Sequence, residues 1–261
     1  MNTEPLLRTG ALAPAAGPAP LARMVARQTR IELRLTLRNG EQLLLNLILP
    51  VLFVVVLVTE PFVEIDGGSR SGFFVPGVLA LAVMSAAFTG QAIATGFERK
   101  YGVLKRLGAT ALPRSALLLG KTGAVGCLEL LQILLIALAA VAVGWRPHGS
   151  PLAVGILVVL GTAAFSGLAL LIAGTLRAET TLALANIVWF GLLLAGDVVF
   201  PLSKFPTAVA DVLGYLPTAA LAHGLRAVLR DGHGLNAHDT LTLLAWAIVG
   251  LTAAARWFRW E

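Results

Sequence analysis

Long apolar runs, separated by short charged segments, make up most of the chain. A helix needs roughly 20 apolar residues to cross a bilayer, and six of the runs reach or approach that length. The pattern therefore predicts an all-α integral membrane protein with six transmembrane helices in one domain, residues 21–261. The predicted spans cover residues 43–59, 73–96, 116–143, 152–176, 182–200 and 240–255.

The composition argues against a soluble or nucleic-acid-binding protein. The 261-residue chain is 57% hydrophobic and 13% charged, whereas soluble domains are about 45–50% apolar and about 25% charged. The mean hydropathy is +0.83. The net charge of +6 comes from basic residues that lie mostly between apolar runs. This favours a lipid bilayer as their partner and no nucleic acid.

The positions of Lys and Arg predict which side of the membrane each segment faces. With six spans and both termini inside, 14 of the 20 Lys and Arg residues are cytoplasmic and five lie outside. Because positive charge concentrates in cytoplasmic segments, both termini are predicted to be cytoplasmic. Residues 1–20 contain four prolines and no apolar run suited to a signal peptide, so we expect a flexible tail.

Residues 21–40 have the spacing of an amphipathic helix. Five basic residues recur every three or four positions and fall on one stripe; they are Arg23, Arg27, Arg30, Arg34 and Arg38. We interpret the segment as a helix at the level of the lipid headgroups rather than an ordinary solvated charged helix.

Residues 97–115 alternate charged side chains with apolar ones such as Tyr101, Leu104 and Leu107, until Gly108 and Pro113 interrupt the pattern. A short amphipathic helix fits this alternation, and its apolar face would be costly to leave in water, so it is expected to dock on another surface. The simpler interpretation is a positively charged anchor loop.

The stretch 201–239 contains Pro201, Pro206 and Pro217 and two apolar patches, residues 207–216 and 218–229. Neither patch is long enough to cross a bilayer. They are predicted to form short re-entrant or interfacial helices before the last span.

Motifs for nucleotide, metal or hydrolytic chemistry do not appear. The segment from Ser115 to Thr122 approaches a phosphate-binding loop, but its first glycine is replaced and no strand precedes it. His233 and His238, near two aspartates, are interpreted as a solvated turn rather than a metal site. The chain is therefore expected to have no ATPase or other enzymatic site of its own and to bind no cofactor or metal.

Polar residues inside the predicted spans are candidates for a substrate path: Glu129, Gln132 and Asn186. An acid at membrane depth usually faces a bundle interior, a cavity or a partner. Glu129 is therefore either a substrate or proton site or a structural contact between helices. Lys121 is expected to extend to the headgroups, and Asp197 to lie near water at the outer end of its span.

Two segments of the chain resemble the type-2 ABC exporter permeases of the drug- and polyketide-exporting kind, such as the daunorubicin-resistance permeases. The first runs from Glu98 through Pro113 to Lys121 and looks like the first cytoplasmic loop of that family. The second runs from Gly196 to Pro206 and is followed by Tyr215-Leu-Pro217 and His223-Gly-Leu-Arg226. The six-span layout and the chain length also agree with the family.

The resemblance implies a permease subunit that moves an apolar or amphipathic substrate across a bacterial cytoplasmic membrane. Two such permeases, identical or related, would work with two cytoplasmic ATPase subunits, which would bind ATP and Mg. The 97–115 loop would be the helix that couples to the ATPase, beside the connecting helix at 21–40. Its coupling residues would be Glu98, Arg99, Tyr101, Gly102, Leu104, Arg106, Leu107 and Pro113, with Tyr101, Leu104 and Leu107 seated in a groove of the ATPase.

The resemblance also implies an outer gate in the segment 201–230. Its residues would be Phe200, Pro201, Phe205, Pro206 and Pro217. Two other functions remain open from the sequence: a stand-alone proton-coupled transporter that uses Glu129, and a membrane enzyme or assembly subunit.

Overall fold

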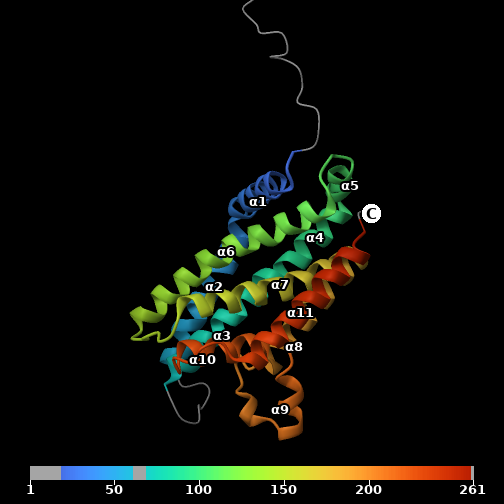
Figure 1. Cartoon of the computed structure of the whole chain (residues 1–261). Coiled ribbons are helices and arrows are strands. Elements are labelled where there is room, and N and C mark those ends of the chain that lie inside the picture. The colour runs from blue at the N-terminus through green and yellow to red at the C-terminus, as the bar shows by residue number, and fades with distance from the viewer. Residues whose placement is uncertain (1–18, 61–68, 260–261) are drawn as a thin grey trace, which may run out of the picture.

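The computed structural model describes residues 19–60 and 69–259, and this part of the chain is helical and without strands (Figure 1). Most of the predicted tail, residues 1–20, lies outside the described residues. The helices are α1 (Leu21–Arg38), α2 (Gly40–Thr59), α3 (Arg70–Met84), the π-helix η1 (Ser85–Gly90), α4 (Gln91–Lys100), α5 (Val103–Gly108), α6 (Arg114–Ala142), α7 (Pro151–Thr175), α8 (Ala178–Ala195), the 3₁₀ turn η2 (Leu202–Lys204), α9 (Thr207–Leu213), α10 (Pro217–Leu229) and α11 (Ala237–Trp257).

Within the described residues, five helices are long and apolar enough to cross a membrane. They are Arg70–Lys100, which joins α3, η1 and α4, and then Arg114–Ala142, Pro151–Thr175, Ala178–Ala195 and Ala237–Trp257. A sixth crossing is present if α9 and α10, which meet at an angle of 91°, count as one broken span. The predicted all-α integral membrane fold is confirmed, with five or six candidate spans.

The first predicted span, residues 43–59, coincides with α2, whose apolar part is short. This part, Asn46–Thr59, extends about 21 Å at a rise of about 1.5 Å per residue. The hydrocarbon core of a bilayer is about 30 Å thick. Length and composition therefore do not by themselves make α2 a full crossing, in contrast to the five longer helices.

The helix formed by α3, η1 and α4 is the centre of the bundle. In its most apolar stretch 89% of the residues are buried, compared with 22% in α8. Between Phe73 and Met84 every side chain is buried. The other helices surround this one and leave apolar faces exposed on α6, α8 and α11, as expected for surfaces that contact lipid.

The two ends of the bundle carry different elements (Figure 1). Helices α1 and α5 and the C-terminal end of α11 lie at one end, which we call the α5 end. Helices α9 and α10 lie at the opposite end, which we call the α9 end. The segments 21–40 and 97–115 thus share one end, and 201–229 lies at the other. The assignment of the α5 end to the cytoplasm stays a prediction.

Helices α7 and α11 pack so closely that their backbones touch at two glycines. A Cβ atom added to Gly167 would lie 2.6 Å from the backbone carbonyl carbon of Gly250. Small residues are common at such helix contacts in membranes, where close backbone packing replaces the hydrophobic effect. The pairing of α7 with α11 depends on the absence of a side chain at this point.

We expect Gly167→Ala to lower the free energy of unfolding by about 1–3 kcal/mol, because the added methyl group overpacks the α7–α11 contact. The matched control is Gly155→Ala on the same helix, where a Cβ atom would meet nothing within 4 Å. That control should leave stability unchanged or slightly raised. Thermal unfolding in detergent measures both, and equal behaviour of the two variants would contradict the packing argument.

Candidate functional site

The predicted coupling segment forms a helix–turn–helix at the α5 end of the bundle. Helix α4 ends at Lys100, the chain turns at Gly102, and α5 begins at Val103. Gly102 has φ +71°, in the left-handed region that costs other residues roughly 1–2 kcal/mol. Glycine at this position therefore allows the tight turn that directs α5 across the end of the bundle.

Only part of the predicted coupling set faces outward. Within the predicted set, the side chain of Tyr101 is 67% exposed and Arg106 is also exposed. Val103, which the prediction did not include, is 40% exposed beside them. Leu107 is half-buried. This outward surface combines an aromatic ring, a β-branched side chain and a cation, which suits contact with another protein.

The structure contradicts the expectation that Leu104 is seated in a groove of a partner. Its side chain is fully buried within this chain, where it packs in a small cluster with Leu117, Leu170 and Phe258. With α5 lying on the bundle, one of its faces must cover the apolar ends of α6, α7 and α11. Leu104 therefore anchors α5 to the rest of the bundle.

The remaining coupling residues hold the segment in place. Arg99 donates a hydrogen bond to the carbonyl oxygen of Leu176, at the end of α7. Pro113 is the N-cap residue of α6. Lys100, next to Arg99, forms an exposed ion pair with Glu179 of α8. These contacts position the α4–α5 turn over the ends of α7 and α8.

Glu98 belongs to a buried charged cluster that joins three helices. The Nζ atom of Lys121 on α6 lies 2.9 Å from Glu32 Oε1 on α1 and 2.5 Å from Glu98 Oε2 on α4. Lys121 is only 4% exposed. Its side chain therefore does not extend to the headgroups, contrary to the expectation from the sequence. Gln28 Nε2 also donates to Glu32 Oε1 at 2.7 Å. We call Glu32, Glu98 and Lys121 the Lys121 cluster.

Helix α1 presents opposite faces to the bundle and to its surroundings. Its buried side carries Gln28 and lies directly on α6, where a Cβ atom at Gly120 would come within 2.5 Å of Gln28 Cγ. The stripe predicted from the sequence lies on the exposed side; its members are Arg23, Arg27, Arg30, Arg34 and Arg38. The location of this stripe at the headgroups stays a prediction.

A cavity of about 650 Å³ lies between α2, the central helix and α8. This volume falls in the range of about 300–1,000 Å³ that small-molecule sites occupy. Its lining is mostly apolar, with a few amide and hydroxyl groups: Asn39, Asn46, Leu49, Pro50, Phe53, Leu81, Ser85, Thr89, Gly90, Ile93, Ala94, Asn186, Trp189 and Phe190. The cavity can hold an apolar or amphipathic molecule and orient it through a small number of hydrogen bonds.

The π-helix η1 forms one wall of this cavity through Ser85, Thr89 and Gly90. π-Helical turns interrupt the regular register of an α-helix and are frequent at functional sites. Trp189 of α8 crosses to this wall and donates from Nε1 to Ser85 Oγ at 2.9 Å. The contact connects the two helices that border the cavity.

Of the three residues predicted for the substrate path, Asn186 lines this cavity. Glu129 and Gln132 are each 1% exposed and do not line it. Glu129 accepts a hydrogen bond from Thr162 on α7, and Gln132 Nε2 donates to the carbonyl oxygen of Asn46 on α2 at 2.7 Å. Both side chains thus make contacts between helices, which was the structural alternative for Glu129.

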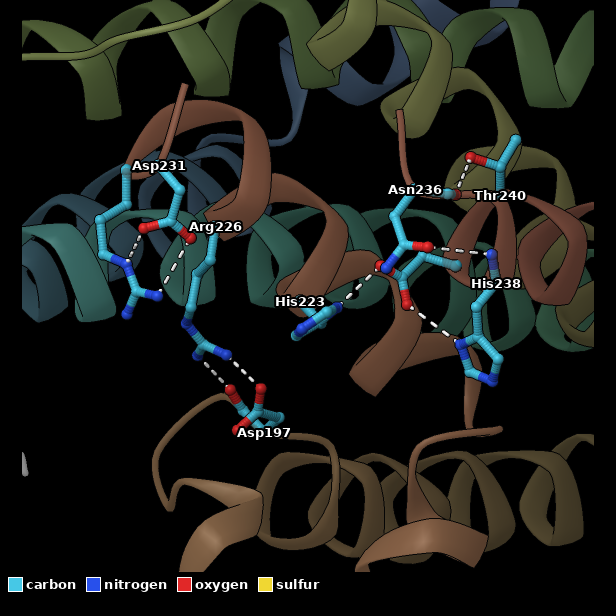
Figure 2. A network of polar contacts seen from close by, with 9 residues as sticks. Asp197, His223, Arg226, Asp231, Asn236, His238 and Thr240 are labelled. Carbon is cyan, nitrogen blue, oxygen red and sulfur yellow. Dashed lines mark hydrogen bonds and ion pairs between the residues drawn. The ribbon is translucent and has the colours of Figure 1, made fainter. Parts of the chain in front are cut away.

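A buried ion pair organises the α9 end (Figure 2). Asp197, in the turn after α8, and Arg226 of α10 point toward each other and are 6% and 4% exposed. The Arg226 guanidinium also donates from Nε to the carbonyl oxygen of Phe73 at 3.1 Å and lies 3.8 Å from the centre of the Phe73 ring. Asp197 accepts a hydrogen bond from the backbone N–H of Leu202 at 3.0 Å. Asp197 is therefore buried and paired.

The predicted outer-gate residues lie on the segment from the end of α8 to the first residue of α10. Pro201 lines a cavity of about 320 Å³ together with Asp197 and Arg226. Phe200 is 41% exposed and Phe205 is partly buried. Pro206 is the N-cap residue of α9, and Pro217 is the buried first residue of α10. A role of these residues as a gate stays a prediction.

A second polar contact joins α10 to α11. Asp239 is 2% exposed, and its carboxylate lies 2.8 Å from His223 Nδ1 and 3.3 Å from His238 Nδ1 (Figure 2). Asp239 is thus buried rather than part of a solvated turn. Asp231, nearby in sequence, pairs with Arg230 at 2.7 Å, which lowers its pKa below the usual range. No group of three or more His, Cys, Asp or Glu residues suited to a metal occurs in the described ranges.

The fold and these features define a multi-pass membrane protein with a helical element at one end and an apolar cavity in its flank. A comparison with family models identifies the family of this protein. The model described as ABC-2 type transporter matches residues 26–229, from within α1 to the end of α10. The chain belongs to this family, whose members are the membrane component of a transporter that works with an ABC ATPase. No match was found among the curated proteins compared with the chain.

The two buried charge contacts were not anticipated from the sequence. Glu32, Glu98 and Lys121 are separated by more than twenty residues at each step, and only the tertiary fold brings their side chains together. The Asp197–Arg226 pair had a weak signal. Asp197 lies in the second segment that resembles the family and Arg226 in the motif that follows it, and each is a charge in apolar surroundings that needs a partner.

We expect Arg226→Met to lower the free energy of unfolding by about 3–5 kcal/mol, because it leaves the Asp197 carboxylate buried without its partner. Arg230→Met is the matched control on the neighbouring turn. It breaks a partly exposed pair with Asp231 and should cost no more than about 1 kcal/mol. Thermal unfolding of the two purified variants tests the difference, and a stable Arg226→Met protein would show that Asp197 does not need this partner.

Proposed function

We propose that the chain is the membrane-spanning permease subunit of an ATP-driven exporter in a bacterial cytoplasmic membrane. Two ATPase subunits, which bind ATP and Mg, would dock at the α5 end, so that this end and both termini face the cytoplasm. The proposal rests on one observation. The side chains of Tyr101, Val103 and Arg106 are exposed on the α4–α5 turn and the short helix α5, at one end of the bundle. In a chain of the ABC-2 family, this is a surface that an ATPase partner can contact.

The cavity supports an apolar or amphipathic substrate, of the drug, antibiotic or lipid-like class. Its walls carry the ring systems of Phe53, Trp189 and Phe190, with Asn46 and Asn186 as polar groups. Phe190 is 59% exposed, so the cavity reaches the outer surface of the chain. A second permease, identical or related, packed against α2 and α8 would enclose it between the two subunits.

A displacement of α5 can be transmitted to this cavity through the central helix formed by α3, η1 and α4. The turn at Gly102 joins α5 to α4, and α4 is continuous with η1, which forms a wall of the cavity. A shift of α5 driven by closure of the ATPases would therefore change the position of Ser85 and Thr89. Preferential binding of the closed ATPase pair to one arrangement of these helices would drive the change in access.

The location of Glu129 gives less support to the proton-coupled alternative. A carboxyl group that carries protons along a transport path must reach the path, whereas Glu129 is buried between α6 and α7 and is bound by Thr162. The permease proposal assigns Glu129 a structural role between these helices.

We expect the tagged chain, purified from its native membrane in mild detergent, to recover an ATPase that contains a phosphate-binding loop. Mass spectrometry identifies the recovered proteins and their ratio, and a second permease in equal amount would indicate a heterodimer. Repeated recovery of the folded chain without any ATPase would contradict the proposed function.

We expect Tyr101→Ala and Leu104→Ala to separate docking from folding. Tyr101→Ala removes an exposed ring and should weaken recovery of the ATPase without changing stability. Leu104→Ala removes a fully buried side chain and should lower the free energy of unfolding by about 2–5 kcal/mol. Thermal unfolding and co-purification are measured on both variants. The proposed docking surface is wrong if Tyr101→Ala recovers the ATPase as well as the unchanged chain does.

A further inference from the structure

The Lys121 cluster lies where three elements of the proposed coupling apparatus meet. Glu32 comes from the arginine-striped helix α1, Glu98 from α4 four residues before the turn at Gly102, and Lys121 from the spanning helix α6. Lys121 is 4% exposed, and the carboxylate side chains of Glu32 and Glu98 are 15% and 24% exposed. The cation Lys121 is thus paired with two anions, Glu32 and Glu98, near the turn that leads from α4 into α5.

A small cavity adjoins the cluster, and its mostly apolar lining contains several polar side chains. It has a volume of about 60 Å³, and its lining includes Glu32, Lys121, Gln91 and Thr95. Gln91 and Thr95 are 5% and 0% exposed, and among the described residues their side chains have no hydrogen-bond partner. Such a lining is suited to ordered water, which occupies roughly 30 Å³ per molecule.

Separation of the three helices would be costly. Moving Lys121 away from either glutamate would leave an unpaired charge in surroundings of low polarity, and breaking a buried pair is strongly destabilising. The close contact of α1 with α6 at Gly120 adds a steric constraint. The three helices are therefore expected to move together rather than slide past one another.

We infer that Lys121 is a positioning residue that links α1, α4 and α6 into one unit, so that a displacement of α5 is passed to all three helices. The inference rests on the proposed function and deepens it. The turn at Gly102 would pass movement to Glu98, and Lys121 would pass it to α6 and, through Glu32, to α1. Because α4 continues into η1, the same unit includes the wall of the 650 Å³ cavity.

The test compares a neutralised cluster with a conservative replacement in the complete complex of permease and ATPase. The neutral variant is Glu32→Gln, Glu98→Gln and Lys121→Met together, which preserves side-chain size and leaves no unpaired charge. We expect it to recover the ATPase normally but to lose at least about fivefold of the stimulation that the permease gives to ATP hydrolysis, the scale of a typical coupling between sites. Lys121→Arg should retain most of the stimulation.

Two single variants make the result independent of the folding of the triple variant. Glu32→Gln keeps the Lys121–Glu98 pair balanced and weakens only the ion pair that links Lys121 to α1, so it should fold and lose part of the stimulation. Asp231→Asn is the control, because it weakens a partly exposed ion pair with Arg230 at the α9 end of the bundle, away from the coupling segment, and should leave the stimulation unchanged.

Each outcome bears on a separate statement. Normal stimulation in the neutral variant, or in Glu32→Gln if the neutral variant does not fold, would overturn the role of the cluster and leave the permease proposal intact. An equal loss in Asp231→Asn would also overturn it. Failure of the unchanged chain to bind or stimulate any ATPase would instead overturn the proposed function, and the role of the cluster with it.

Discussion

A charged side chain that is buried in an apolar helix bundle needs an oppositely charged partner inside the same molecule. Ion pairs of this kind connect helices at the two ends of this bundle. At the α5 end, Lys121 joins α1, α4 and α6 through Glu32 and Glu98. At the α9 end, Arg226 joins α10 to Asp197 and to the first turn of α3. The helices between these ends pack through apolar side chains and close glycine contacts, and the charged contacts add specific links between helices at the two ends.

The central helix connects these contacts with the cavity. Its first turn supplies the Phe73 carbonyl oxygen that Arg226 binds, its π-helical middle forms a wall of the cavity, and its last turn supplies Glu98 to Lys121. A rigid helix can transmit a displacement along its length, and the π-helix is a point at which its register can adjust. The 31-residue helix Arg70–Lys100 is therefore a physical route from the proposed ATPase contact to both the cavity and the α9 end.

Much of the fold follows from local sequence patterns. Apolar runs place the spanning helices because a bilayer imposes one length on each crossing, and the spacing of Arg23 to Arg38 predicts the exposed stripe of α1. Gly102, Gly108 and Pro113 delimit the short helix α5 because glycine and proline interrupt helices. The family resemblance in the segments beginning at Glu98 and Gly196 agrees with the family match over residues 26–229. The limited apolar length of α2 was visible in the same pattern.

Tertiary structure alone decided which side chains meet. Leu104, Lys121 and Asp197 have the local pattern of an exposed contact, a headgroup anchor and an acid near the end of its span, yet all three are buried. Leu104 is buried because α5 packs on the ends of α6 and α7, Lys121 because α1 packs on α6, and Asp197 because α10 brings Arg226 against it. Glu129 and Asn186 both looked like substrate-path residues, but only Asn186 faces the cavity. The sequence by itself determined the approximate positions of the apolar helices and the family. The pairing of buried charges and the location of the cavity depend on how helices distant in sequence pack, which a local pattern does not encode.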